Sequence, residues 1–172
     1  GKDATNSLCD YMNPAAVRQF IDWTHEQYKK YLGRDLGTTV LGFRGDEPDY
    51  AHTPWTPAII EMFKKQKGYD PSPYLASFFT RKLTLKEQRV KADYWDVWSE
   101  LFATHFFQQQ AEWCEENGLA HITHLNNEHN MPVCVRAEGD FFRNLSRVQI
   151  PGVDAIWNQI WPETVNDFPK LA

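Results

Sequence analysis

The sequence predicts an α/β fold with about three parallel strands and long amphipathic helices, arranged as a partial (β/α)8 barrel. Two strand-like apolar runs, residues 40–47 and 120–128, each end on a glutamate. Helical patterns separate these runs, and strands separated by helices pair in parallel through right-handed crossovers. A closed barrel needs eight strands and about 250 residues. The 172 residues therefore predict a single domain, or a fragment of a barrel domain, over residues 1–172.

Three helix starts are predicted where a residue that can cap a helix stands directly before a proline, at Asn13-Pro14, Thr56-Pro57 and Ser72-Pro73. Proline at the first helical position costs nothing because its missing N–H has no partner there. The first helix should extend to about Leu32, and the second should end before Gly68. The third is short.

A long amphipathic helix is predicted over residues 85–117, with Gly118 closing it. The chain then enters the second strand, over residues 119–125. A short helix follows at about residues 140–147, and a third strand begins in the run 150–156. Trp95, Trp98 and Trp113 on the long helix are expected in the core.

Composition excludes several classes of function. The net charge of −5 and the pI near 5.7 argue against nucleic acid and anionic membranes as partners, because both require a basic face. No stretch approaches the roughly 20 apolar residues of a membrane span, and the residues Gly1-Lys2-Asp3 lack the apolar core expected of a signal peptide. Cys9, Cys114 and Cys134 are odd in number and lack CxxC spacing, so we expect buried or idle thiols rather than zinc ligands or disulfides.

The two glutamates that end strands predict a catalytic pair. Parallel α/β sheets carry reactive side chains at the carboxyl ends of their strands, and two opposed carboxylates can cleave a glycosidic bond. We therefore predict that Glu47 and Glu128 are catalytic. Apolar sequence neighbours of Glu47 suit a general acid, whereas the polar neighbours of Glu128 suit an ionised base. The competing interpretation is that Asp46-Glu47-Pro48 forms a solvated turn.

Several motifs in the same order resemble glycoside hydrolase family 106, the α-L-rhamnosidases. They are residues 42–48, Phe63 with residues 68–70 and 73–75, residues 93–95, and residues 139–142 with 150–154. The resemblance spans about residues 10–156. It implies an inverting enzyme on a β/α barrel that removes terminal α-L-rhamnose from polysaccharides with the help of calcium, outside the cell or in the periplasm. Family members are much larger, so this chain alone is expected to be inactive.

Residues near the predicted strand ends also suggest a set of carbohydrate-binding side chains. His124 and Asn126 are expected to contact sugar hydroxyl groups, and Trp55 and Trp157 to stack under a sugar ring. Asp46 and Asp49 are candidate calcium ligands, because hard cations take carboxylate oxygens.

Two alternatives come from other classes of protein. The chain can be a noncatalytic fragment or an engineered half-barrel that self-associates, because about three strands leave two open sheet edges. It can also be a small carbohydrate-binding module that uses exposed tryptophans. Solution mass distinguishes the first alternative, and sugar binding that survives removal of both glutamates distinguishes the second.

Overall fold

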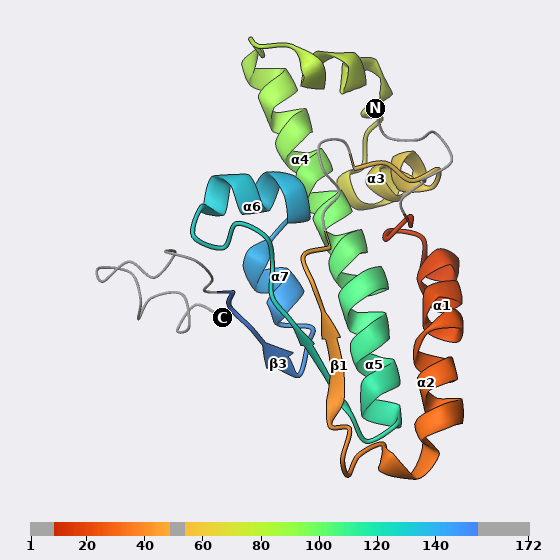
Figure 1. Cartoon of the computed structure of the whole chain (residues 1–172). Helices are drawn as coiled ribbons and strands as arrows, with labels where there is room; N and C mark the ends of the chain where they lie inside the picture. Colours follow the sequence, from red (N-terminus) through yellow and green to blue (C-terminus); the bar gives the residue numbers. More distant parts are fainter. Residues whose placement is uncertain (1–8, 49–53, 155–172) are drawn as a thin grey trace, which may run out of the picture.

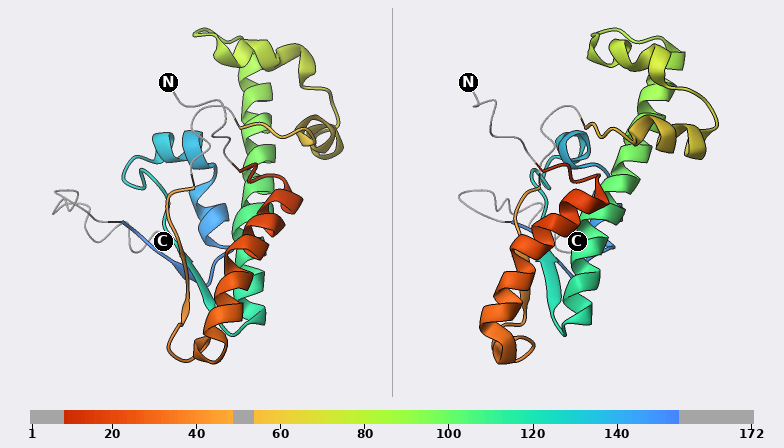
Figure 2. Two further views of the ribbon diagram at one scale, coloured as in Figure 1. Left: turned by 45° about the vertical axis from the view of Figure 1, so that its right-hand side comes forward. Right: turned by 90° about the vertical axis from the view of Figure 1, so that its right-hand side faces the viewer.

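The computed structural model describes residues 9–48 and 54–154 (Figure 1). Within these residues, a long helical rod runs beside a small parallel sheet, and shorter helices pack around both (Figure 2). The mixture of three parallel strands and long helices confirms the α/β class. None of the described helices is long and apolar enough to cross a membrane.

The sheet consists of β1 (Gly42–Gly45), β2 (Ala120–Thr123) and β3 (Ile150–Pro151), in the order β1-β2-β3. Both pairings are parallel, and Phe43 lies opposite His121 in the register. The prediction that the first two strands are parallel neighbours is therefore confirmed. The strands are shorter than predicted, and residues 155–156 of the expected third strand lie outside the described residues.

The predicted first helix is two helices, α1 (Pro14–Trp23) and α2 (His25–Leu32). The two helices meet at Thr24, whose φ of −115° and ψ of −76° are distorted from regular helical values. Its hydroxyl group donates to the Phe20 carbonyl oxygen over 2.6 Å, a local bond that competes with the helical ladder. A single periodic pattern does not reveal such a break, so the prediction of one helix was wrong here.

The next helical segments are α3 (Ile59–Lys67) and η2 (Ser72–Phe79). α3 ends at Gly68 as predicted, in left-handed geometry at φ 78°, which glycine adopts without steric cost. The short helix expected after Ser72 is a 3-10 helix.

The long rod contains α4 (Leu85–Phe102), the π-helical η3 (Ala103–Gln108) and α5 (Gln109–Glu116). Thr84 and Glu87 form a reciprocal capping box at its start. Its apolar stripe supplies much of the core, including the fully buried Trp98 and Phe102. α1 and α2 lie alongside α5 (Figures 1 and 2). Trp98 and Trp113 are buried as predicted, and Trp95 is half-buried against the core.

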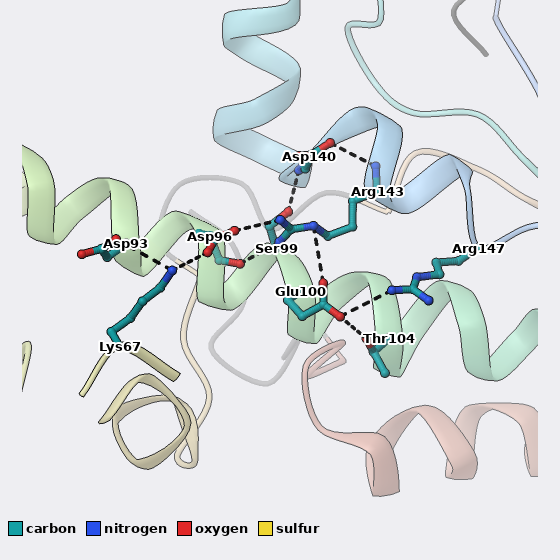
Figure 3. Close-up of polar contacts among 9 residues, drawn as sticks. All are labelled: Lys67, Asp93, Asp96, Ser99, Glu100, Thr104, Asp140, Arg143 and Arg147. Atoms are coloured by element: carbon teal, nitrogen blue, oxygen red, sulfur yellow. Dashed lines mark hydrogen bonds and ion pairs between the residues drawn. The ribbon is translucent and has the colours of Figure 1, made fainter. Parts of the chain in front are cut away.

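Two helices follow β2, namely α6 (Met131–Glu138), which the sequence patterns did not predict, and α7 (Phe141–Leu145). A network of charged and polar side chains holds α7 against α4 (Figure 3). Arg143 donates to Asp96 over 2.8 Å and lies 3.4 Å from Glu100. Lys67 adds α3 to this network through Asp96. All three cysteines are free thiols, as expected, and Cys114 and Cys134 are buried.

Candidate active site at the carboxyl edge of the sheet

The carboxyl ends of the three strands bring their polar side chains together. β1 leads into Glu47, β2 into His124, and β3 into Asp154. One ligand atom from each of these three residues lies within 4.8 Å of the others. Glu47 adopts a positive φ of 38°, which is uncommon outside glycine and occurs often at functional sites. The sheet edge is therefore the best candidate for a site in the described part of the chain.

His124 is the centre of this cluster. Nη2 of Arg44 lies 3.2 Å from His124 Nδ1, and because arginine only donates, Nδ1 must accept. A neutral imidazole then carries its proton on Nε2. That nitrogen lies 3.4 Å from Asp46 Oδ1, 3.8 Å from Glu47 Oε1 and 4.0 Å from Asp154 Oδ2. A buried N–H thus faces three carboxylates.

Glu128 lies at the same end of the sheet, in the loop that follows β2. Its Oε1 accepts from the backbone N–H groups of Leu125, over 3.1 Å, and Asp154, over 3.3 Å. Glu128 is 5% exposed, and burial raises the pKa of its carboxyl group. The Glu47 side chain is 42% exposed.

These surroundings are the reverse of what the sequence neighbours predicted. Glu47 was expected to have apolar surroundings and Glu128 polar ones. The Glu47 side chain is largely open to solvent, although Phe43 and Pro48 lie close to it in sequence. Glu128 is buried because its loop folds back onto the ends of β2 and β3.

A second buried glutamate supports this loop. The fully buried Glu138, at the end of α6, accepts the backbone N–H of Asn126 with both carboxylate oxygens at 3.0 Å. The side chain of Asn126 accepts from Asn127 Nδ2 over 2.8 Å. Asn126 is half-buried, so its predicted contact with a sugar requires this side-chain bond to change or to be shared.

The other predicted binding residues lie elsewhere or outside the described residues. Trp55 is half-exposed and lines an apolar cavity of about 580 Å³ together with Phe78, Phe79 and Trp95. None of the residues of the carboxylate cluster lines that cavity. Asp49 and Trp157 lie outside the described residues. Sugar stacking by the two tryptophans stays a prediction.

Comparison with known proteins identifies the family. The family model of glycoside hydrolase 106, described as alpha-L-rhamnosidase, matches residues 1–168. The chain belongs to glycoside hydrolase family 106. No curated protein matches the chain.

Among solved structures, the family 106 chain is similar to a rhamnosidase from Novosphingobium sp. PP1Y, with a TM-score of 0.65 and 24% sequence identity. The similarity covers 80% of this chain and 13% of that one. This likeness shows that the two segments share a fold. Because the similarity covers 13% of the solved protein, this chain corresponds to only a small part of its length.

Sequence reasoning missed three residues of the candidate site. Asp154 stands at the end of the third strand, so the rule that selected Glu47 and Glu128 applies to it as well. Arg44 lies on β1 and was not considered as a partner of His124. Glu138 is the last residue of α6, a helix that was not predicted, and no local signal indicates that its side chain reaches Asn126.

Proposed function

We propose that this segment is part of the catalytic barrel of an α-L-rhamnosidase and carries its two catalytic carboxylates, Glu47 and Glu128. The observation that carries the proposal is their placement at one edge of a parallel sheet, where Asp154 contacts Glu128 and clusters with Glu47. The three strands would supply three of the eight barrel strands. Family membership supports the choice of terminal α-L-rhamnosides as substrates.

The two carboxylates divide acid and base roles by their surroundings. An inverting enzyme needs a protonated acid against the leaving oxygen and an ionised base that activates water on the opposite face of the sugar. The raised pKa of Glu128 suits the acid, because a buried carboxyl group keeps its proton nearer neutral pH. The more exposed Glu47 then acts as the base. His124, whose N–H faces Glu47, can orient that carboxylate.

Calcium is the cofactor that the family resemblance implies, and the residues at the sheet edge fit it in part. Asp46, Glu47 and Asp154 offer carboxylate oxygens, which calcium prefers. His124 Nε2 fits poorly, because the Arg44 bond places a proton on that nitrogen. When bound, the ion would offset the mutual repulsion of the carboxylates. Asp46 and Asp154 are the proposed ligands, and the role of Asp49 stays a prediction.

The substrate is proposed to be a rhamnose-containing glycan or glycoside, and an extracellular or periplasmic location stays a prediction from the family. The decisive experiment uses a full-length rhamnosidase that contains this segment, with an aryl α-L-rhamnoside and time-resolved proton NMR. We expect β-L-rhamnose as the first product, followed by mutarotation. Initial release of α-L-rhamnose would contradict the inverting mechanism, and absence of hydrolysis would contradict the proposed activity.

A further inference from the structure

The loop that carries Glu128, residues 124–130, is bonded near its start to the end of the helix that follows it. α6 begins directly after this loop and ends at Glu138, which is fully buried. The carboxylate of Glu138 accepts the backbone N–H of Asn126, 12 residues earlier in the sequence. This bond therefore ties the loop to the residue at which α6 ends.

Two neighbouring amide groups of the loop thus pair with two buried glutamates. The N–H of Leu125 donates to Glu128, and the N–H of Asn126 donates to Glu138. Asn127, which links Asn126 to Glu128, adopts a positive φ of 61°, a conformation that is uncommon outside glycine. Such a conformation persists where surrounding contacts hold it. The path of the backbone from Asn126 to Glu128 is therefore set by the contacts on either side of Asn127.

The backbone around Glu138 is itself fixed by two helices. The carbonyl oxygen of Glu138 accepts from Nδ2 of the buried Asn144, on α7, over 2.6 Å. Two residues after Glu138, the N–H of Asp140 donates to Oγ of Ser99, on α4, over 2.6 Å (Figure 3). Glu138 therefore connects the Glu128 loop to the helical core.

A carboxylate suits this connection better than an amide does. An ionised carboxylate only accepts hydrogen bonds, so either oxygen can hold the Asn126 N–H, whereas a glutamine side chain has a donor at one end. Burying a carboxylate is costly unless it forms charge-assisted hydrogen bonds. Because Glu138 is fully buried, it does not reach a substrate. What it can affect is the position of the loop.

We propose that Glu138 is a positioning residue for catalysis, which holds the Asn126 N–H and thereby sets the placement of the Glu128 carboxyl group against the glycosidic oxygen. The inference rests on the proposed function, in which Glu128 is the general acid. A misplacement of about 1 Å can cost on the order of 10²-fold in rate. The loss should depend on the leaving group, because a poor leaving group needs the acid most.

The test measures kcat and KM of Glu138→Ala in a full-length rhamnosidase that contains this segment, on aryl α-L-rhamnosides with leaving groups of different acidity. On the poorest leaving group kcat should fall about tenfold or more, and on the most acidic one by no more than about twofold, because that phenolate departs without much protonation. KM should change little, because Glu138 does not touch the sugar. A merely structural role would instead lower kcat by the same factor on every substrate, through loss of folded enzyme.

Glu100→Ala is the matched control. Glu100 forms ion pairs from α4 to Arg143 and Arg147 (Figure 3), so its removal weakens the same helical packing and leaves the Asn126 bond in place. The ratio of kcat between good and poor leaving groups should stay as in the unmutated enzyme. Glu138→Gln keeps one acceptor oxygen and should show the same dependence as Glu138→Ala with a smaller loss. It decides the question if Glu138→Ala fails to fold.

Glu128→Gln, measured on the same substrates, separates failure of this inference from failure of the proposed function. We expect a loss that depends on the leaving group in both Glu128→Gln and the Glu138 variants. If only Glu128→Gln shows it, and the Glu138 variants lose activity equally on all substrates or not at all, the positioning role is overturned and the acid role of Glu128 stands. If Glu128→Gln lacks this dependence, Glu128 is not the acid and both proposals are overturned.

Discussion

The backbone N–H of Asp154 donates to Oε1 of Glu128 over 3.3 Å and joins the loop after β3 to the loop after β2. The same carboxylate oxygen accepts the N–H of Leu125. Glu128 therefore both holds the sheet edge together and presents a buried carboxyl group at the candidate site. Changes that loosen these loops should affect the site even when they occur some distance from it.

Removal of the Glu138 carboxylate should loosen the loop that carries Glu128. In Glu138→Ala the N–H of Asn126 loses its acceptor and a void remains, so we expect the free energy of unfolding to fall by about 2–4 kcal/mol. Glu138→Gln retains an acceptor oxygen and should lose less than half as much. Urea denaturation measures both variants, and equal stability of Glu138→Ala and the unmutated chain would refute this role.

Gly139 should tolerate no side chain, because two independent constraints apply there. Its φ of 80° and ψ of −151° fall in a region that is essentially restricted to glycine, and an added Cβ would lie 2.6 Å from Ser99 Oγ. Gly68, at φ 78° with open space around it, is the matched control. We expect Gly68→Ala to cost about 1 kcal/mol and Gly139→Ala clearly more. Equal losses in thermal denaturation would show that Ser99 moves aside freely.

Stability should fall in mild acid because of His25 and His121. Their pKa values are about 4 in the folded chain, against about 6.5 when unfolded. Between these values the unfolded chain binds more protons, so the free energy of unfolding decreases as the pH falls from 6.5 to 4. The upper limit is roughly 3 kcal/mol for each histidine. Urea titrations across this range should show a flatter dependence for His25→Phe, and an unchanged slope would contradict the prediction.

The isolated chain should self-associate. Trp23 and Tyr31, on α1 and α2, are 73% and 76% exposed, and Leu41 and Phe79 are also largely exposed. Exposed aromatic surface of this kind favours association. Light scattering should give a mass above the 20.1 kDa of one chain, and Trp23→Ser with Tyr31→Ser should reduce it. A monomer at high concentration would contradict this prediction.

Much of the fold could be predicted from the sequence because its signals are local. Proline after a capping residue marked the start of α1, glycine marked the end of α3 and α5, and alternating helices and strands indicated parallel pairing. The break at Thr24 and the helix α6 escaped prediction. The first depends on one side-chain hydrogen bond, and the second is short and has no side-chain cap.

The candidate site was only partly predictable, because burial is set by contacts that are distant in sequence. The positions of Glu47 and Glu128 followed from strand ends. Their surroundings did not, since Glu128 is buried through a contact with Asp154, 26 residues away. Arg44 and His124 are 80 residues apart in sequence. They come together only because β1 pairs with β2, which a local sequence pattern does not reveal.

The central claim is that Glu47 and Glu128 are the catalytic pair, with Glu128 as the acid. It is tested most directly by the kcat of Glu47→Gln and Glu128→Gln in a full-length rhamnosidase that contains this segment, on aryl α-L-rhamnosides with good and poor leaving groups. Both variants should lose orders of magnitude in kcat, and Glu128→Gln should recover substantially with the most acidic leaving group. Near-normal turnover of either variant would contradict the claim, and recovery confined to Glu47→Gln would reverse the two roles.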